Sequence, residues 1–436
     1  MLPKLLPALC ALAISGAHCT SLGVDYHVGP GQPMQTIAQV PWKSLGPGDR
    51  VNIHWRPEPY KEKWVICRRG TPEKPIVVRG IPGPHGELPM IDGAGAVTVK
   101  SLNYTGEQRA VIKIGASRIP ADCVPANIVI EGLDVSGASP TNSYEGIKGV
   151  AAYMGCASGI WVEKGERIVI RGCAIHDNAN GFFVSHASRD VLLERCDLFG
   201  NGVVKSMYEH NAYTEASGMV YQFNHFGPLR PGALGNNLKD RSSGLVVRNN
   251  WIEGGNREIQ IADAEDSVAI QKEPAYQRTV VSGNVIIEPA GDGGNQIVCY
   301  GGDSGKLNQY RKGTLVFENN TVISKRPDST TLFRMMTNDE LLAARNNVFY
   351  TAGPGKGLAL ADSVGLFELN DNWIKQGWVN AHSKFTGSVR PGEGNSGGTM
   401  PNFVNMSAGD YRLAPGSDQG AHLVLVKGRF TRVEER

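Results

Sequence analysis

The chain has 436 residues, of which 20% are charged and 54 are glycine, and its formal net charge is +2. This composition excludes a disordered or coiled-coil protein. The near-neutral charge also excludes the basic surface that binding to a phosphate backbone normally requires. We therefore expect a globular protein with no nucleic-acid partner, whose ligand is neutral or acidic and is bound locally.

The first 19 residues, MLPKLLPALCALAISGAHC, have the pattern of a secretory signal peptide. Lys4 precedes an apolar run that is too short to span a bilayer comfortably, and small residues follow at positions 15 to 17. No later run approaches the length of a membrane span. We therefore expect an exported protein, periplasmic or extracellular, whose mature chain is not inserted in a membrane.

Residues 20–100 are predicted to form an N-terminal cap and the first coils of the fold. The stretch PMQTIAQVPWKSL, residues 33–45, has the apolar spacing of a short helix. Such a helix would cover the open end of a sheet, which otherwise favours aggregation. The later segments GPGDRVNIHW and KPIVVRGIPG each contain a predicted strand punctuated by proline and glycine.

From Arg167 onward one phrase recurs, with a period of about 22 to 35 residues, and the main coils are predicted over residues 101–375. Each copy has a short alternating strand, an Asn or Cys, a second short strand and a turn, as in GLVVRNNWIEGGN and TLVFENNTVIS. A single unit cannot bury its apolar face, whereas stacked units form one continuous core. We therefore predict an all-β fold, a parallel β-helix, as one domain over residues 20–436, with C-terminal coils and loops in residues 376–436.

Two other architectures fit the repeat less well. A β-propeller needs a longer and more regular period, and a β-sandwich would not repeat one phrase. Recurring asparagines and cysteines are interpreted as structural, because asparagine tolerates the left-handed backbone of tight corners. These residues are Asn249, Asn250, Asn319, Asn320, Asn346, Asn347, Cys173 and Cys196. The cysteine spacing fixes no disulfide pairing and does not match a zinc site.

The repeat also predicts which residues of neighbouring strands are aligned. Counting back from equivalent anchors at Ile168, Val191, Met219 and Leu245 gives two columns: Val162, Ser185, Tyr213 and Lys239 in one, and Lys164, Ala187, Glu215 and Arg241 in the other. Residues two apart on a strand share a face, and neighbouring strands lie about 4.8 Å apart. Tyr213, Glu215, Lys239 and Arg241 are therefore predicted to form one outward patch. Asn211 and Asn237 extend it, and Leu238 points inward.

Neighbouring coils are expected to add polar groups to this face. Alternation in NREIQIADAED turns Glu258 and Gln260 outward, because Ile259 and Ile261 are apolar. Further outward residues are expected at Gln296, Val298, Tyr300 and Arg334 on one side, and at His210, Ser185 and His186 on the other. His186 fits an internal histidine equally well.

The segment NNLKDRSSGLVVRNNWIEGGN resembles the segment that carries the catalytic lysine in chondroitinase B and alginate lyases of polysaccharide lyase family 6, whose pattern runs roughly K-S-S-x-N-V-x-R-N-N-T. The overall layout is similar to that of secreted right-handed parallel β-helix proteins. The resemblance implies a right-handed coil, a lysine base at Lys239, and an arginine acid from the following coil. Ala262 stands near that arginine's place, so Arg241 or Arg257 would replace it.

The same resemblance implies a calcium ion held by Asn and Glu, for which Asn211 and Glu215 are the candidates. Gly232, Ala233 and Leu234 stand where the family has acidic residues shortly before its lysine. Calcium is therefore an expected cofactor only if these two residues suffice to bind it.

The expected chemistry is β-elimination on an acidic, uronate-containing polysaccharide. Lys239 would act as the base, because neighbouring cations lower its pKa. Arg241 would bind the uronate carboxylate through two parallel hydrogen bonds. Tyr213 or His210 would act as the acid or as an alternative base, and Glu215 would orient Lys239. The residues expected to bind substrate are Asn211, Glu215, Asn237, Arg257, Glu258, Gln260, Tyr300, Arg334 and His186, and we expect a monomer.

Two other classes of function are open. A β-helix glycoside hydrolase needs two carboxylates at a defined separation, for which Glu215, Asp240, Glu258 and Asp263 are candidates. The NTD, DD and RIK motifs typical of β-helix polygalacturonases are absent. A non-catalytic solenoid would use the same patch to bind a glycan without cutting it.

Overall fold

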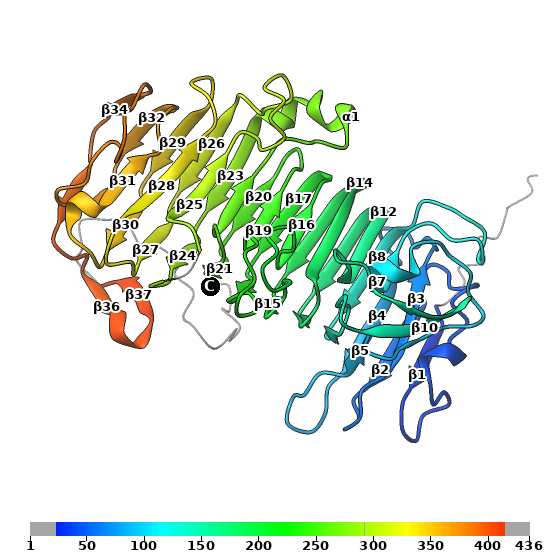
Figure 1. Cartoon of the computed structure of the whole chain (residues 1–436). Coiled ribbons are helices and arrows are strands. Elements are labelled where there is room, and N and C mark those ends of the chain that lie inside the picture. Colours follow the sequence, from blue (N-terminus) through cyan, green and yellow to red (C-terminus); the bar gives the residue numbers. More distant parts are fainter. Residues whose placement is uncertain (1–22, 292, 415–436) are drawn as a thin grey trace, which may run out of the picture.

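The computed structural model describes residues 23–291 and 293–414, so the expected signal peptide lies outside the described residues. Over the described chain, short strands follow one another, and most of them pair in parallel with a strand of the next coil (Figure 1). Each central coil contributes three such strands, which form three stacks along the molecule. This arrangement confirms the predicted parallel β-helix.

The three stacks are termed the site sheet, the second sheet and the third sheet. The site sheet contains β3 (Glu62–Ile66), β7 (Ala110–Ile114), the first part of β12 (Ser158–Arg171), the first part of β14 (Asn180–Glu194), β16 (Ala212–Thr214), β19 (Leu238–Asp240), β22 (Ile259–Ile261), β25 (Gln296–Tyr300), β28 (Thr330–Met335) and β31 (Leu358–Ala361). A lateral extension near the N-terminal end contains β6 (Val97–Thr98), β10 (Ser143–Gly146) and β11 (Gly149–Ala152).

The other two stacks complete the coil. The second sheet contains β1 (Asp25–Val28), β2 (Arg50–His54), β4 (Ile76–Ile81), β8 (Ala126–Glu131), the later parts of β12 and β14, β17 (Ser217–Gln222), β20 (Val246–Arg248), β23 (Arg278–Ser282), β26 (Thr314–Glu318), β29 (Leu341–Arg345), β32 (Leu366–Asn370) and β34 (Ser388–Pro391). The third sheet contains β5 (Met90–Asp92), β9 (Asp134–Ser136), β13 (Ala174–His176), β15 (Asp197–Phe199), β18 (His225–Phe226), β21 (Trp251–Glu253), β24 (Val285–Glu288), β27 (Thr321–Ser324), β30 (Val348–Thr351), β33 (Trp373–Lys375) and β35 (Ser396–Gly398). A separate hairpin of β36 (Phe403–Asn405) and β37 (Asp410–Leu413) follows.

The inward residues of the three sheets form one continuous apolar core. Ile168 pairs with Val191, and Val191 pairs with Met219, as the sequence register predicts. All three side chains are buried. Parallel stacking therefore places equivalent residues of successive coils directly beside one another, which is what aligns the functional side chains on the outside.

A ladder of buried asparagines closes the corner between the second and third sheets. Asn250 Oδ1 accepts hydrogen bonds from the backbone N–H and from Nδ2 of Asn224, and Asn284 Oδ1 does the same for Asn250. The preceding residue Asn249 has a positive φ of 54°. Buried polar groups are thus satisfied along the corner. The structural interpretation of these asparagines is confirmed, and Cys173 and Cys196 are buried free thiols.

The predicted N-terminal helix is wrong. The segment contains only the 3-10 turn η1 (Ile37–Gln39), because Val40 turns to extended backbone before Pro41. Its apolar side chains still cover the end of the core: Trp42 is 1% exposed and stacks on Trp64, with ring centroids 5.2 Å apart. Capping is therefore achieved by packed side chains without a regular helix.

Helical segments are short throughout the described residues. They are α1 (Val268–Gln271) and the 3-10 turns η2 (Glu107–Arg109), η3 (Pro274–Gln277), η4 (Gly355–Gly357) and η5 (Met406–Ala408), besides η1. None of the helices over these residues has the length and apolar character needed to cross a membrane.

Candidate functional site

One outward column of the site sheet carries the candidate site. Strand pairing aligns Trp161, Phe183, Tyr213, Lys239, Gln260, Cys299 and Arg334 in this order. The predicted pairing of Tyr213 with Lys239 is confirmed. Leu238 and Asp240 on either side of Lys239 are buried in the core. Along the column, aromatic side chains give way to a lysine and then to an arginine.

The N-terminal part of the predicted column is shifted. Trp161 and Phe183 take the positions expected for Val162 and Ser185. The cause is an irregularity in β12 and β14, where the register shifts after Val162, and such bulges change which residue faces outward. His186 lies exposed at this bend, outside the column.

Lys239 lies at the centre of the column. Its Nζ atom is 2.8 Å from Oδ2 of Asp303, and its side chain is 15% exposed. The same ammonium is 5.2 Å from the centroid of the Tyr213 ring. Burial lowers the pKa of Lys239, and the charge of Arg241 lowers it further, whereas Asp303 opposes the shift. A lysine with a lowered pKa is better suited to remove a proton near neutral pH.

Asp303 brings a carboxylate into this column from the loop that follows β25. Its Oδ2 accepts a hydrogen bond of 2.8 Å from Gln260 Nε2, in addition to the contact with Lys239. Its Oδ1 lies 2.8 Å from Arg241 Nη2. Although burial alone would raise the pKa of Asp303, Lys239 and Arg241 lower it, so the group is ionised. Three donors thus form a binding site for a carboxylate.

The loop that presents Asp303 is itself held in place. The backbone N–H of Asp303 donates a hydrogen bond of 2.7 Å to Asp263 Oδ1, and Ser304 Oγ donates to the other oxygen of Asp263. Arg311 is fully buried and donates to the carbonyls of Ala262 and Ser242 at 2.8 Å each. Sequence reasoning missed Asp303 and Arg311, because both lie in a non-repeating loop.

Arg241 is buried behind Lys239, with only 4% of its side chain exposed. Its Nε donates to the Tyr213 hydroxyl at 2.9 Å, and its Nη1 donates to the Asp263 carbonyl. Its Nη2 contacts Glu265 at 3.0 Å as well as Asp303. The expected open, bidentate site on Arg241 is therefore wrong, because the protein's own groups occupy the guanidinium. A ligand can reach it only by replacing Asp303 or Glu265.

Tyr213 and His210 lie side by side, with ring centroids 5.5 Å apart and planes at 83°. Burial raises the pKa of Tyr213 despite the opposing charge of Arg241, so the phenol keeps its proton. His210 Nδ1 accepts a hydrogen bond from the Asn236 backbone N–H at 2.9 Å. Burial, aided by Lys239, lowers the pKa of His210 to about 3. His210 is therefore neutral, with Nδ1 engaged as an acceptor, and its ring packs edge-on against that of Tyr213.

Glu215 lies beyond Tyr213 on the same chain segment and is 3% exposed. Burial and the negative charge of Asp266 raise the pKa of Glu215 to about 8. Its carboxyl group is therefore protonated at neutral pH, so it cannot orient Lys239 as an anion. The raised pKa marks Glu215 as a group whose ionisation opposes folding.

The expected calcium ligands do not fit together. Asn211 is fully buried, its Oδ1 accepts from Asn201 at 2.9 Å, and its Nδ2 donates to Asn237 at 2.8 Å. Four residues of extended chain separate Asn211 from Glu215, a distance of roughly 13 Å. No cluster of three or more acidic, histidine or cysteine side chains suited to a metal occurs among the described residues. No step of the chemistry is therefore assigned to calcium.

Several other expected site residues point into the protein. Tyr300 is buried because Cys299 takes the outward place opposite Gln260. Asn237 is buried and accepts a hydrogen bond from Asn211 at the corner between the third sheet and the site sheet, and Glu258, Asp240 and Asp263 are each 0% exposed. Asp240 accepts hydrogen bonds from Thr214 at 2.6 Å and from Ser242. These residues are structural, so they do not contact a ligand on the outer face.

Two expected binding residues do converge beyond Cys299. Arg257 Nη2 donates to Gln296 Oε1 at 2.9 Å, and Arg334 Nη1 reaches the same oxygen at 3.4 Å. Gln296 Nε2 in turn contacts Asp362 at 3.3 Å. Both arginines are partly exposed, and within the described chain neither has a carboxylate within 4.0 Å. Two guanidinium groups that share one neutral acceptor attract an anion.

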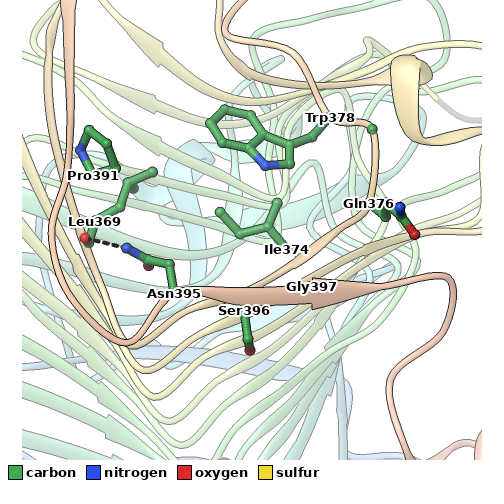
Figure 2. A pocket seen from close by; sticks show the side chains of 9 residues that line it. Leu369, Ile374, Gln376, Trp378, Pro391, Asn395, Ser396 and Gly397 are labelled. Atoms are coloured by element: carbon green, nitrogen blue, oxygen red, sulfur yellow. Dashed lines mark hydrogen bonds between the residues drawn. The ribbon is translucent and has the colours of Figure 1, made fainter.

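A separate pocket of about 460 Å³ opens at the C-terminal end of the solenoid, away from Lys239. Figure 2 shows Trp378 and Ile374 beside it, with Asn395 Nδ2 donating to the Leu369 carbonyl at 2.7 Å. Its lining residues are Leu369, Ile374, Gln376, Gly377, Trp378, Pro391, Asn395, Ser396 and Gly397. This lining contains no acidic, basic or thiol group, so we place no chemistry there.

A family model described as "Right handed beta helix region" matches residues 91–308. Among curated proteins, no relative matches this chain.

Several solved structures are similar at low identity. The alginate lyase from Paenibacillus sp. str. FPU-7 is 14% identical, with a TM-score of 0.46 over 69% of this chain and 88% of that chain. The pectate lyase Pel9A is 11% identical, with a TM-score of 0.48 over 91% of each chain. The lacto-N-biosidase of family GH136 from Eubacterium ramulus is 11% identical, with a TM-score of 0.46 over 86% of this chain and 68% of that chain.

Proposed function

This chain belongs to the right-handed β-helix family, and from that premise we propose that it cleaves an acidic polysaccharide by β-elimination, with Lys239 as the base. The proposal keeps the role that Lys239 takes from its resemblance to polysaccharide lyase family 6. It differs from that resemblance in using no calcium and in assigning the acid to Tyr213.

One observation carries the proposal: a carboxylate already lies between Lys239, Arg241 and Gln260, at 2.8 Å from each. When substrate binds, a uronate carboxylate takes the place of the Asp303 side chain. The carbon next to that carboxylate is then close to Lys239 Nζ. The site thus presents the base beside the acidic C–H bond that elimination must break.

The elimination steps use groups of this column. The neutral amine of Lys239 takes the proton from the carbon next to the carboxylate, and the electron pair is delocalised into the carboxylate as an enolate-like anion. Arg241 and Gln260 stabilise this charge through N–H groups already positioned for a carboxylate. The electron pair then forms a carbon–carbon double bond as the glycosidic C–O bond breaks. The Tyr213 hydroxyl donates its proton to the leaving oxygen, and exchange with water restores both residues.

The Arg257 and Arg334 pair extends the proposed binding surface along the column beyond Cys299. Lys239, Gln260, Cys299 and Arg334 lie on four successive strands, so Arg334 is about 14 Å from Lys239 along the column. That separation is too large for both to contact one sugar unit. The pair therefore binds the carboxylate of a different unit of the same chain.

A hydrolase is the second candidate, and a different observation favours it. Asp303 and Glu265 both contact Arg241 Nη2, at 2.8 Å and 3.0 Å. Their carboxylates therefore lie close together, as the paired carboxylates of a retaining glycosidase do. In that reaction Asp303 would be a catalytic group, whereas in the elimination it is a competitor of the substrate.

The experiment is a screen of uronate-containing polysaccharides, read by ultraviolet absorbance for the new double bond and by reducing ends. Elimination yields both signals together, and the Lys239→Met variant loses both. The exposed Lys272, which forms no ion pair in the described chain, supplies the control Lys272→Met, with unchanged activity. Reducing ends without absorbance would assign the protein to the hydrolases. Full activity of Lys239→Met would exclude Lys239 as the base.

A further inference from the structure

The outward column continues past Tyr213 toward the N-terminal end of the solenoid. Phe183 is the next residue of the column and is half-buried. Its ring meets that of Tyr213 edge-on, with centroids 5.0 Å apart and planes at 63°. The floor beside Lys239 is therefore aromatic over two successive strands, a surface that suits the C–H face of a sugar ring.

An arginine stands at the end of this aromatic floor. The guanidinium carbon of Arg109 lies 4.7 Å from the centroid of the Trp161 ring and 5.3 Å from that of Phe183. Arg109 is half-buried. Among the described residues no carboxylate pairs with it and no side-chain hydrogen bond engages its guanidinium. Stacking on two rings holds the cation in place while leaving its N–H groups available.

The neighbouring cation Lys113, unlike Arg109, has a carboxylate partner at this end of the sheet. Lys113 also stacks on Trp161, at 4.9 Å, but its Nζ lies 2.8 Å from Glu163 and donates to the Thr105 carbonyl. Its side chain is 1% exposed. Lys113 is thus a neutralised, internal charge, whereas Arg109 has the same aromatic support and no anion.

The loop before Arg109 passes close to the Trp161 ring at Gly106 and so positions Arg109 beside that ring. Gly106 has a φ of +74°, and a Cβ atom at this position would lie 2.8 Å from the Trp161 ring. Only glycine allows the chain to pass this close to the indole in that conformation. The turn η2 then begins at Glu107 and ends at Arg109, whose guanidinium lies over the Trp161 and Phe183 rings.

We propose that Arg109 and Phe183 form a second carbohydrate subsite, which binds the ring and the carboxylate of another uronate unit of the substrate. The inference rests on the proposed function, because it assumes that the polysaccharide lies along the column. Phe183 and Lys239 are two strands apart, which is about 10 Å. The subsite therefore engages a unit that is not the one cleaved, and binding favours chains over single uronate residues.

The test is calorimetric binding of uronate trisaccharides, namely those of mannuronate, guluronate and galacturonate, and of the corresponding monosaccharides. Arg109→Gln is expected to weaken binding of the preferred trisaccharide about tenfold, the loss of one charge-assisted contact, and to leave monosaccharide binding unchanged. Arg109→Lys, which keeps the charge, is expected to restore part of the affinity. Arg189→Gln is the matched control, because Arg189 is exposed on the same strand as Phe183 and no aromatic ring of the described residues stacks with its guanidinium.

The result separates this subsite from the proposed function. Equal trisaccharide affinity of the wild type and Arg109→Gln overturns the subsite, even if the wild type produces unsaturated products from a polysaccharide. Failure of every trisaccharide to bind the wild type overturns it as well. Tenfold weaker binding by Arg109→Gln supports the subsite even if no ultraviolet-absorbing product is formed. The absence of that product would reject the proposed elimination but not the subsite.

Discussion

Asp303 and Lys239 form an ion pair across the outward column, with Oδ2 and Nζ 2.8 Å apart. The pair joins the loop after β25 to a strand two coils earlier. It places a carboxylate where the proposed substrate would place its own. In the free protein, Asp303 therefore occupies the place of the proposed acidic ligand, and it can be removed by mutation.

Replacing Asp303 with Asn separates the two proposed chemistries. In elimination, Asp303→Asn removes the competing charge, so affinity for the acidic polysaccharide rises and activity is retained. The pKa of Lys239 also falls, because Asp303 raises it in the wild type, so the acidic limb of the pH profile, where Lys239 becomes protonated, moves to lower pH. In hydrolysis the same variant loses activity by about 100-fold or more. Initial rates across a pH series, with absorbance and reducing ends read together, distinguish the two outcomes.

Removing the Tyr213 hydroxyl should slow the chemical step. Tyr213→Phe keeps the ring beside Lys239 and His210 but removes the proton donor. We expect kcat to fall by about 10²- to 10⁴-fold with a small change in KM. The control is Tyr208→Phe, because Tyr208 is 73% exposed on a nearby loop. An unchanged kcat for Tyr213→Phe would assign the acid to another group.

The two converging arginines should act together in binding. Arg257→Gln or Arg334→Gln is expected to raise KM for an acidic polysaccharide about tenfold, with kcat retained, and to reduce the dependence of KM on salt. The double variant should lose less binding free energy than the two single variants lose together, because both arginines contact Gln296. Arg248→Gln is the matched control, since Arg248 also donates to a glutamine, Gln222, but on the second sheet. Additive effects, or an equal effect of the control, would contradict a shared anion site.

The raised pKa of Glu215 predicts a pH dependence of folding. Its pKa is about 8 in the folded protein against an ordinary value of 4.5, so the folded state binds the proton more tightly. The resulting stabilisation is complete below pH 4.5 and is lost as pH rises through 8. Thermal unfolding of Glu215→Gln should therefore match the wild type near pH 4 and exceed it near pH 9. A constant difference in Tm across this range would show that the carboxyl does not titrate in the folded state.

The asparagine ladder should respond to truncation as a buried polar network. Asn284 donates to Val247 and Asn320 and accepts from Asn250, so Asn284→Ala leaves buried partners unsatisfied. We expect the free energy of unfolding to fall by about 3 kcal/mol. Asn319→Gly is the control, because Asn319 is exposed and has a positive φ of 57° that glycine adopts freely. Denaturant unfolding measures the free energy of unfolding of both variants. A loss below about 1 kcal/mol for Asn284→Ala would show that the neighbouring asparagines find other hydrogen-bond partners.

The coil and the contact between Tyr213 and Lys239 can be predicted from the sequence, because both depend on a strand period of two and on a repeated phrase. The prediction of outward residues fails where the repeat is irregular. The sequence register aligns Ser185 in place of Phe183, because the irregular register in β12 and β14 leaves no mark in the apolar pattern. It also predicts that Tyr300 points outward. The strand QIVCY has apolar residues on both faces, so its pattern does not show which residues face the core.

Asp303 could not be predicted for a different reason. It belongs to a loop with no counterpart in other coils, and its contact with Lys239 depends on how Asp263 holds the loop. The saturation of Arg241 has the same origin, because two of its partners, Asp303 and Glu265, lie outside the strands. The repeat determines the floor of the candidate site, whereas the irregular loops determine which of its charges are available.

The outward column also has a direction. All its strands run parallel, so its two ends differ: Phe183 lies toward one end and Arg334 toward the other. A polysaccharide is directional too, with distinct reducing and non-reducing ends. For a polysaccharide bound along the column as proposed, the unlike ends would distinguish the two directions in which the polymer can lie. The order of the coils would then set the polarity of the bound chain, and hence the fragment that carries the new double bond.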